Sequence, residues 1–252
     1  MASQRGQSAY ADEFPEIPPE KWIQWLREDS FPEWGNVNGT LSDRLTAMNI
    51  DDVVAEYIDP DNLVVEIGPA EGYTSIGMCN ITGADVLGID LPAVFAGGTA
   101  TNRHGPGPEP SFLGGVAPFL PVQDSVADGV AAFNSVTYLA RNIGTVAADR
   151  LAAAGHVPDG RYDVAREVYV DRMVDDLLHD MARVTDDDGY ALLAEQTDCS
   201  YLVLEKDSST GWTVRDHDAH PDYLGDAFHI RYGPWVRHPS VEWAQDSARH
   251  TY

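Results

Sequence analysis

Apolar runs and expected helices alternate along the middle of the chain. Four short apolar runs have the length and composition of buried strands: 63–67, 85–90, 129–134 and 190–196. Helices are expected between and after them, at 73–81, in the stretch that follows residue 134 through 154, and at 162–184. Strands that alternate with helices predict a parallel sheet covered on both faces, so we expect a doubly wound α/β fold.

The two ends of the chain have different patterns. Residues 1–16 are polar, and we expect a mobile terminus there. Helices are expected at Pro18–Asp29 and Thr40–Ile58, and together they would form an N-terminal helical cap over residues 17–59. Three short segments near the C-terminus, SYLVLEK, GWTVRDH and FHIRYGPWVRH, predict an antiparallel edge of the sheet. Residues 60–252 would therefore form one globular domain with the cap.

Two segments interrupt the alternation. The glycine- and proline-rich stretch AGGTATNRHGPGPEPS is expected to replace or shorten a crossover helix. The sequence TDDDG, 185–189, is expected to end the long helix at Val184 before the last parallel strand begins. Neither segment changes the expected fold class.

The charge of the chain limits its partners. Asp and Glu number 41 against 16 Lys and Arg in 252 residues, a formal net charge of −25. Such a chain repels phosphate backbones and anionic bilayers, so we expect no nonspecific nucleic-acid binding and no membrane binding. The acid is spread along the whole chain, and only Lys21 and Lys206 are lysines, as in haloarchaeal proteins. We therefore expect a halophilic protein that needs molar salt; an acidic interaction surface is the alternative.

Cysteine usage and the N-terminal sequence indicate a compartment. Cys79 and Cys199 are too few for a disulfide framework, which favours a reducing environment. The first residues contain no apolar signal-peptide core, and no window approaches the roughly 18 apolar residues of a membrane span. We expect a soluble, cytoplasmic protein.

The stretch NLVVEIGPAEGYTSIGM, 62–78, passes from a strand to a helix through a turn with two glycines. Gly68 and Gly72 allow the backbone to bend and to approach a ligand, and the helix start offers unpaired N–H groups. The dinucleotide fingerprint G-x-G-x-x-G is not met, because Ala70 occupies its middle position and Gly72 comes one residue early. A nicotinamide or flavin dinucleotide is therefore disfavoured.

Two acids lie next to this turn in the expected sheet. Glu66 would repel a pyrophosphate, but it could bind an ammonium group directly or through water. Asp90 ends the second strand, where an acid can accept both hydroxyls of a ribose. The pair indicates a ligand with an amino-acid end and a nucleoside end; surface acids in an acid-rich chain are the alternative.

Several segments resemble one family. VVEIGPAEG and VLGIDLP resemble motifs I and II of the class I S-adenosylmethionine-dependent methyltransferases. LPVQDSVADGVAAFNSVTYL is similar to the family's segment before and through the fourth strand, and LLHDMARVTDDDGYALLAE to its helix, turn and fifth strand. The resemblance extends from Leu63 to Glu195 in the family's order. It implies a Rossmann-like sheet that binds S-adenosylmethionine.

The matching positions imply a role for each predicted site residue. Glu66 would orient the methionine amino group, and Asp90 would hold the ribose hydroxyls. Leu91 would pack on the adenine ring, and Asn134 would face the methionyl side and the substrate. The turn around the methionyl part would consist of Gly68, Ala70 and Gly72.

Two departures from the family's pattern change the expectations. The family often has an acid near the end of strand three for adenine, but Val116 stands there, so the base would depend on the Ala117 backbone. The fourth strand ends in FNSV rather than the [DN]-P-P-[YF] of many enzymes that methylate base nitrogens. This ending disfavours a nucleic-acid acceptor.

Other chemistry-bearing residues receive no firm role. The aromatic set Trp22, Trp25, Trp34 and Tyr57 could form a lid, but ordinary helix packing is the simpler interpretation. Residues 215–223 have loosely metal-like spacing, yet we expect no metal in a chain so rich in aspartate. His104 and Tyr138 could lie near a substrate, and no spacing makes either a base.

The expected function is methyl transfer from S-adenosylmethionine to a small-molecule acceptor. In this chemistry the cofactor carries the electrophile, and the protein aligns the reactants and excludes water. A general base is needed only if the acceptor keeps its proton, so no catalytic signature is expected. Two alternatives remain: a catalytically silent methyltransferase-fold protein that binds the cofactor or a partner, and a nicotinamide-dependent oxidoreductase.

Overall fold

A computed structural model of the chain describes residues 10–28, 45, 49–95, 107–195, 200–207, 211–217 and 236–237. The described strands form one sheet in the order β3-β2-β1-β4-β5-β6-β7-β8. They are β1 Leu63–Ile67, β2 Asp85–Asp90, β3 Ser111–Gly114, β4 Ala127–Phe133, β5 Thr185–Glu195, β6 Ser200–Asp207, β7 Gly211–His217 and β8 Val236–Arg237. The helices are η1 Ala11–Glu13, α1 Pro19–Glu28, α3 Asp51–Tyr57, α4 Tyr73–Thr82, α5 Pro92–Phe95, α6 Val136–Ala153 and α7 Tyr162–Val184.

The sheet has a parallel half and an antiparallel half. Strand β1 pairs in parallel with both β2 and β4, and the parallel pairing continues to β3 on one side and β5 on the other. Strands β6 and β7 pair antiparallel beyond β5. The chain changes direction of travel across the sheet between β1 and β4, which is where open α/β sheets bind ligands. The doubly wound, mainly parallel sheet with an antiparallel C-terminal edge is confirmed.

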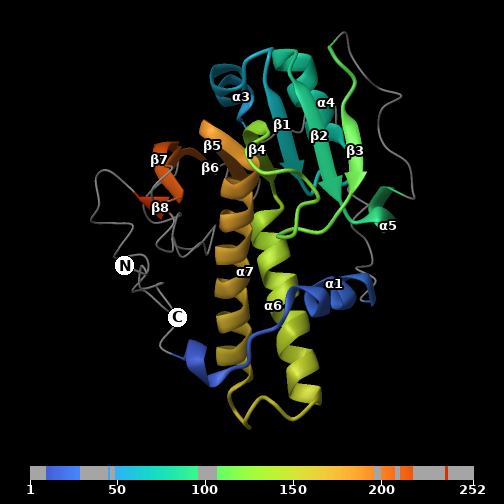
Figure 1. Cartoon of the computed structure of the whole chain (residues 1–252), viewed down its shortest axis with the longest axis vertical. Helices are drawn as coiled ribbons and strands as arrows, with labels where there is room; N and C mark the ends of the chain where they lie inside the picture. Colours follow the sequence, from blue (N-terminus) through green and yellow to red (C-terminus); the bar gives the residue numbers. More distant parts are fainter. Residues whose placement is uncertain are drawn as a thin grey trace.

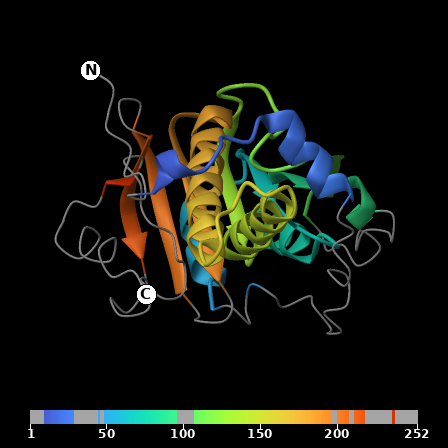
Figure 2. The same ribbon diagram turned by 90° about the horizontal axis from the view of Figure 1, so that it is seen from below.

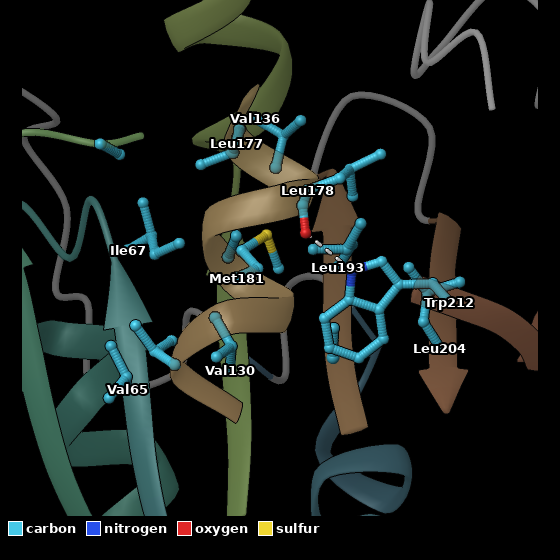
Figure 3. Packing of buried hydrophobic residues seen from close by; sticks show 14 of the residues in the cluster. Val65, Ile67, Val130, Val136, Leu177, Leu178, Met181, Leu193, Leu204 and Trp212 are labelled. Atoms are coloured by element: carbon cyan, nitrogen blue, oxygen red, sulfur yellow. Dashed lines mark hydrogen bonds between the residues drawn. The ribbon is translucent and has the colours of Figure 1, made fainter. Parts of the chain in front are cut away.

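Helices cover both faces of this sheet. On one face, α7 packs on alternate residues of β1, β4 and β5, among them Val65, Val130 and Leu193 (Figure 3). Trp212 of β7 closes this cluster, and its indole N–H donates to the Leu178 carbonyl at 2.9 Å. On the other face, α3 and α4 cover the residues of opposite parity. Because both faces are covered, the central strands β1 and β4 are buried almost throughout.

Helices α6 and α7 extend past the carboxyl ends of β1, β2 and β3, and α1 lies against their protruding part (Figures 1 and 2). Trp22 and Trp25 of α1 are buried in a third cluster. This cluster also contains Tyr169 of α7, Val116, and the partly buried Leu91. Helix α1 is therefore placed at the edge of the sheet where a ligand is expected.

The N-terminal segment differs from the expected mobile terminus in its described part. Phe14 is buried, and its carbonyl accepts from Arg172 at 3.0 Å. The Pro15 carbonyl accepts from the Tyr169 hydroxyl at 2.8 Å and from Arg172 at 2.7 Å. Phe14 and Pro15 are thus packed on α7, because the buried Phe14 ring and these three hydrogen bonds offset the entropy of ordering them.

The helical cap predicted for residues 17–59 is divided between two places. Helix α1 packs in the third cluster, whereas α3 packs on the opposite face through Val53 and Val54. The sequence showed the apolar positions of both helices but gave no sign of the surface that each would cover. Of the aromatic set, Tyr57 lies with α3, away from Trp22 and Trp25, and Trp34 is outside the described residues.

Two local expectations are corrected. The glycine- and proline-rich loop is followed by a short strand, β3, and preceded by the four-residue helix α5, neither of which the pattern predicted. The segment TDDDG lies inside β5 rather than before it, since Ala127 pairs with Thr185 and Gly129 with Tyr190. The intervening residues form an irregularity in the strand, and Asp188 has a φ of 69° there.

Candidate functional site

The turn between β1 and α4 has a backbone that its sequence explains. Gly68 has a φ of 69° and Gly72 a φ of 87°. A Cβ on Gly72 would lie 2.3 Å from the Phe112 ring, and one on Gly68 would lie 2.8 Å from Ser135 Cβ. Both positions therefore need glycine for conformation and for space. Ala70 between them has a φ of 53°, which strains a residue with a Cβ.

Two helix N-termini begin beside this turn without a side-chain cap. Gly72 is the N-cap of α4 and has no side chain to accept from the first N–H groups. Ser135 is the N-cap of α6, but its hydroxyl donates to the Ile67 carbonyl at 2.8 Å instead. Because β1 and β4 are neighbours, two partly positive helix starts lie at one point of the sheet edge. Such a point favours a carboxylate or another anion.

Asp90 connects the end of β2 to the turn. Its carboxylate accepts from the Ala70 N–H at 2.9 Å and from the Leu91 N–H at 2.7 Å. The residue is only 8% exposed, and this burial raises the pKa of the carboxyl above its usual value, while the two backbone hydrogen bonds oppose the shift. Each carboxylate oxygen keeps acceptor capacity beyond these bonds. The left-handed Ala70 is thus what aims its N–H at Asp90.

Glu66 has partners other than the predicted ligand. Its two oxygens accept from the hydroxyls of Thr74 and Ser75 in the first turn of α4. The residue is 1% exposed and lies on the same face of β1 as Val64, which packs toward α4. The strand alternation that buries Val64 also turns Glu66 under the helix. Glu66 therefore supports the start of α4, and its contact with an amino group, directly or through water, stays a prediction.

The other predicted residues lie around the same edge. Asn134 ends β4 with a φ of 57°, and its N–H donates to the Ala194 carbonyl at 2.8 Å. Leu91 is half-buried after β2, and Ala117 is buried in a turn after β3. Ala70 of the turn is hydrogen-bonded to Asp90, and Asn134 is adjacent to Ser135 beside Gly68. Gly115, two residues before Ala117, donates its N–H to the Asp90 carbonyl.

Sequence reasoning missed two contributors to the site. Ser135 packs on Gly68 and fixes the relative position of β1 and α6, and its place after Asn134 at a helix start was a usable signal. Helix α1 was predicted as a helix, but its position over this edge was not. Of the remaining candidates, His104 and residues 218–223 lie outside the described part of the chain, and the Tyr138 side chain is likewise not described.

A second polar feature lies at the opposite edge of the sheet. A surface hollow of about 600 Å³ opens where β5 begins and β6 ends. Lys206 is the cation among its described lining residues. Its ammonium group donates to the Thr185 carbonyl at 2.5 Å and lies 3.5 Å from Asp187. The hollow is lined by Asp187, Asp188, Glu205, Lys206, Asp207 and Thr213. Its amino-edge position separates it from every predicted site residue.

Within the described ranges, no group of three or more His, Cys, Asp or Glu side chains is arranged to hold a metal ion. No helix among the described residues combines the length and apolarity that a membrane crossing requires.

The strand order and the helices on both faces define a Rossmann-like α/β protein, and solved structures with some likeness include methyltransferases. YcgJ from Bacillus subtilis matches 59% of this chain at 17% identity, with a TM-score of 0.38 and 49% of its own length covered. A structure of a complex of the Haloferax volcanii Trm112 methyltransferase activator matches 61% at 17% identity, with a TM-score of 0.39 and 53% covered. Geranyl diphosphate C-methyltransferase from Streptomyces coelicolor A3(2), in complex with Mg²⁺, geranyl diphosphate and S-adenosyl-L-homocysteine, matches 72% at 12% identity, with a TM-score of 0.40 and 53% covered.

The matched region thus spans about half the length of these three chains. Comparison with protein-family models and with curated protein sequences found no match. Likeness at this level concerns the fold, and the function has to be argued from the site itself.

Proposed function

We propose that this protein is an S-adenosylmethionine-dependent methyltransferase that acts on a small-molecule acceptor. The observation that carries the proposal is the bond from the Ala70 N–H to Asp90. It joins a left-handed turn beside two helix starts to a buried acid at the end of the adjacent strand. One side of this arrangement suits a carboxylate, and the other suits the two hydroxyls of a ribose.

The residues present fit the two ends of this cofactor. The amino-acid end would lie at the turn of Gly68–Gly72, with its carboxylate toward the positive N-terminus of α4, which has no side-chain cap. The ribose would lie at Asp90, and the base would lie between Leu91 and the Ala117 backbone. When bound, the cofactor supplies the electrophilic methyl group.

The chain's own residues would contribute binding and exclusion of water. Asp90 keeps acceptor capacity for the ribose, and Glu66 holds the first turn of α4 so that its N–H groups stay in place. Trp22 and Trp25 of α1 bury apolar surface beyond the same strand ends, which keeps water away from that edge. A proton acceptor is needed only for acceptors that are protonated at working pH.

A silent binding protein is the second candidate, and one observation favours it. Glu66 is 1% exposed and faces the hydroxyls of Thr74 and Ser75, so in this arrangement it supports α4 and does not face the site. Val116 also stands where the resembling family often has an acid. Cofactor binding without turnover on any acceptor would support this reading over the enzyme.

The test of the proposal is a calorimetric titration with S-adenosylhomocysteine in multimolar KCl. We expect micromolar affinity for the unaltered protein, and a loss of about 10- to 100-fold in Asp90→Asn, since each lost charge-assisted hydrogen bond weakens binding by roughly 1.5–3 kcal/mol. Asp187→Asn makes the same chemical change in the hollow at the opposite edge and should leave affinity unchanged.

No heat from a folded protein would refute the proposed cofactor, and NADH would be the next titrant. Equal affinity in Asp90→Asn and the unaltered protein would place the ligand elsewhere.

We also propose that the fold depends on molar salt, because the net charge of −25 must be screened. Cys79 offers a readout: burial raises the pKa of its thiol to about 12, with a smaller contribution from Glu66. The thiol is therefore neutral and inaccessible at neutral pH while the fold persists. Maleimide labelling of the Cys79 peptide, measured by mass spectrometry, should be absent in multimolar KCl and complete in dilute buffer. Protection of Cys79 in dilute buffer would contradict a halophilic requirement.

A further inference from the structure

The turn that carries Ala117 is hydrogen-bonded to Asp90 at its N-terminal end. The Phe119 N–H donates to the Val116 carbonyl at 2.7 Å, which closes the turn around Ala117. Just before it, the Gly115 N–H donates to the Asp90 carbonyl at 2.8 Å. One end of the turn is therefore fixed to the acid expected to hold the ribose.

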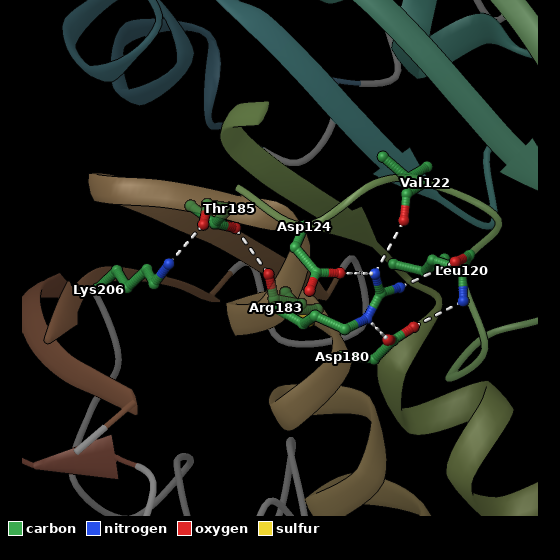
Figure 4. Close-up of polar contacts among 8 residues, drawn as sticks. Leu120, Val122, Asp124, Asp180, Arg183, Thr185 and Lys206 are labelled. Carbon is green, nitrogen blue, oxygen red and sulfur yellow. Dashed lines mark hydrogen bonds and ion pairs between the residues drawn. The ribbon is translucent and has the colours of Figure 1, made fainter. Parts of the chain in front are cut away.

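The other end of the turn is held by the last turns of α7. The Leu120 N–H donates to Asp180 at 2.6 Å, and the Leu120 carbonyl accepts from Arg183 at 2.9 Å (Figure 4). Both backbone polar groups of Leu120 are thus bound by one pair of side chains three residues apart on a helix. Leu120 itself is buried, so its position is fixed by packing and by hydrogen bonds together.

Arg183 joins this pair to the rest of the loop. Its guanidinium donates to Asp180 at 2.7 Å, to the Val122 carbonyl at 2.8 Å and to Asp124 at 2.7 Å. A planar guanidinium can serve four acceptors at once, which a lysine cannot. Burial alone would lower the pKa of Arg183, but the hydrogen bonds with Asp180 and Asp124 raise it, so the group stays charged. Figure 4 shows the loop wrapped around this one side chain.

The two ends of the Ala117 turn are held by different parts of the fold. Asp90 is the last residue of β2, and Ala117 lies in the turn that follows β3, the strand paired with β2. The Gly115 bond fixes one side of the Ala117 turn, and the Asp180–Arg183 pair fixes the other.

We propose that Arg183, together with Asp180, is a positioning residue for the nucleoside half of the cofactor site. This pair holds the Ala117 backbone in the position where the backbone contacts the 6-amino edge of the base, while Asp90 holds the ribose. This inference rests on the proposed function. Arg183 itself touches no ligand; it acts through Leu120 and the turn.

A purely structural role for Arg183 would predict a different result, and Lys206 provides the matched control. Lys206 also binds a backbone carbonyl near the end of α7, that of Thr185, and has no contact with the Ala117 turn (Figure 4). Arg183→Met and Lys206→Met both remove a cation and keep an unbranched chain. Both should lower the midpoint of thermal unfolding.

The experiment measures base selectivity rather than stability. S-adenosylhomocysteine and S-inosylhomocysteine differ in the 6-amino group, which the second compound replaces with oxygen. Calorimetry in multimolar KCl should show that the unaltered protein and Lys206→Met prefer the adenine compound. In Arg183→Met this preference should shrink by about tenfold, in the range by which residues without ligand contact alter binding. Overall loss of folded protein would lower both apparent affinities equally and leave the ratio unchanged.

The outcomes separate this inference from the proposed function. An unchanged ratio in Arg183→Met, with S-adenosylhomocysteine still bound, overturns the positioning role and leaves the cofactor proposal standing. Absence of binding by the folded unaltered protein refutes both. If Arg183→Met does not fold, Arg183→Lys decides, because it keeps the charge beside Asp180 but cannot reach all four acceptors. A reduced ratio in Arg183→Lys supports the inference, and a retained ratio overturns it.

Discussion

The parallel and antiparallel halves of the sheet differ in backbone strain and in buried charge. In the parallel half, the strand ends carry left-handed backbone at Gly68, Ala70 and Asn134 and the buried acids Glu66 and Asp90. In the antiparallel half, β6 and β7 are packed around Trp212, and within 200–207 and 211–217 only Gly211 has a positive φ. Strain and buried charge reduce stability, so they persist only where the surrounding structure holds them.

The two halves of the sheet therefore contribute differently to stability and to ligand binding. The antiparallel half contributes mainly stability, since Leu204 and Trp212 are buried on one face of it and Val203 on the other. The parallel half retains unfavourable conformations beside a helix start, which is where strain is commonly associated with ligand binding. Substitutions in the antiparallel half should therefore lower mainly the free energy of unfolding, and substitutions at the strand ends of the parallel half should lower mainly the affinity for the ligand.

The largest expected effect is that of Trp212→Ala. Removing a fully buried indole leaves a cavity between α7 and β7, and we expect a loss of about 3–5 kcal/mol in the free energy of unfolding. Denaturation in multimolar KCl measures it, and affinity for S-adenosylhomocysteine per folded molecule should not change. Trp212→Phe, with a smaller cavity, serves if the first variant does not fold. A reduced affinity in folded Trp212→Phe would contradict this difference between the two halves.

The pH dependence of binding tests Asp90. Binding of ribose hydroxyls requires the ionised carboxylate, and burial raises its pKa, so affinity should begin to fall at a higher pH than for an ordinary aspartate. The stability contribution has the opposite sign: a raised folded-state pKa gives stability that is present at low pH and is lost as pH rises through that pKa. As the pH is lowered from neutral, the affinity measured by calorimetry should therefore fall, while the contribution of Asp90 to the free energy of unfolding should rise.

The control for this profile is Asp90→Asn, whose weaker affinity should be flat over the same pH range. A falling profile in that variant would assign the titration to another group.

The smallest expected effect is that of Ala70→Gly. A left-handed alanine is strained, and glycine relieves the strain but has a more flexible unfolded chain, so we expect a gain of up to about 1 kcal/mol. The N–H that binds Asp90 is kept, so affinity should stay within about threefold. Ser125→Gly relieves a φ of 51° away from the site and should give a similar gain. A loss of stability in Ala70→Gly alone would show that the methyl group has a packing role.

Much of the fold was predictable because local periodicity reports which residues are buried. The bounds of β1, β2 and α7 agree with the predicted segments, since each is a continuous apolar or amphipathic run with a clear end. Strand β3 was not predicted because its four residues, largely exposed at an edge, carry no such pattern. The irregularity at 186–189 resembles a turn in sequence, and only its pairing with β4 places it inside a strand.

The sequence predicted where the candidate site lies in the sheet better than it predicted the hydrogen-bond partners of its residues. Glycines and acids at strand ends located the turn and Asp90, because parallel strands bring their carboxyl ends to one edge. Glu66 points under α4, where Thr74 and Ser75 donate hydrogen bonds to it. Strand alternation alone could have indicated this direction, because Val64 on the same face is also buried there.

The sequence by itself determined the strands, the long helix and the glycines of the turn, since these follow from burial periodicity and from conformations that only glycine adopts easily. The tertiary structure decided which groups meet: Ala70 with Asp90, α1 with the sheet edge, and Arg183 with a loop that lies 59 to 63 residues earlier in the chain. Such meetings depend on how distant elements pack, and hydrogen bonds between distant residues leave no local pattern from which the pairing could be inferred.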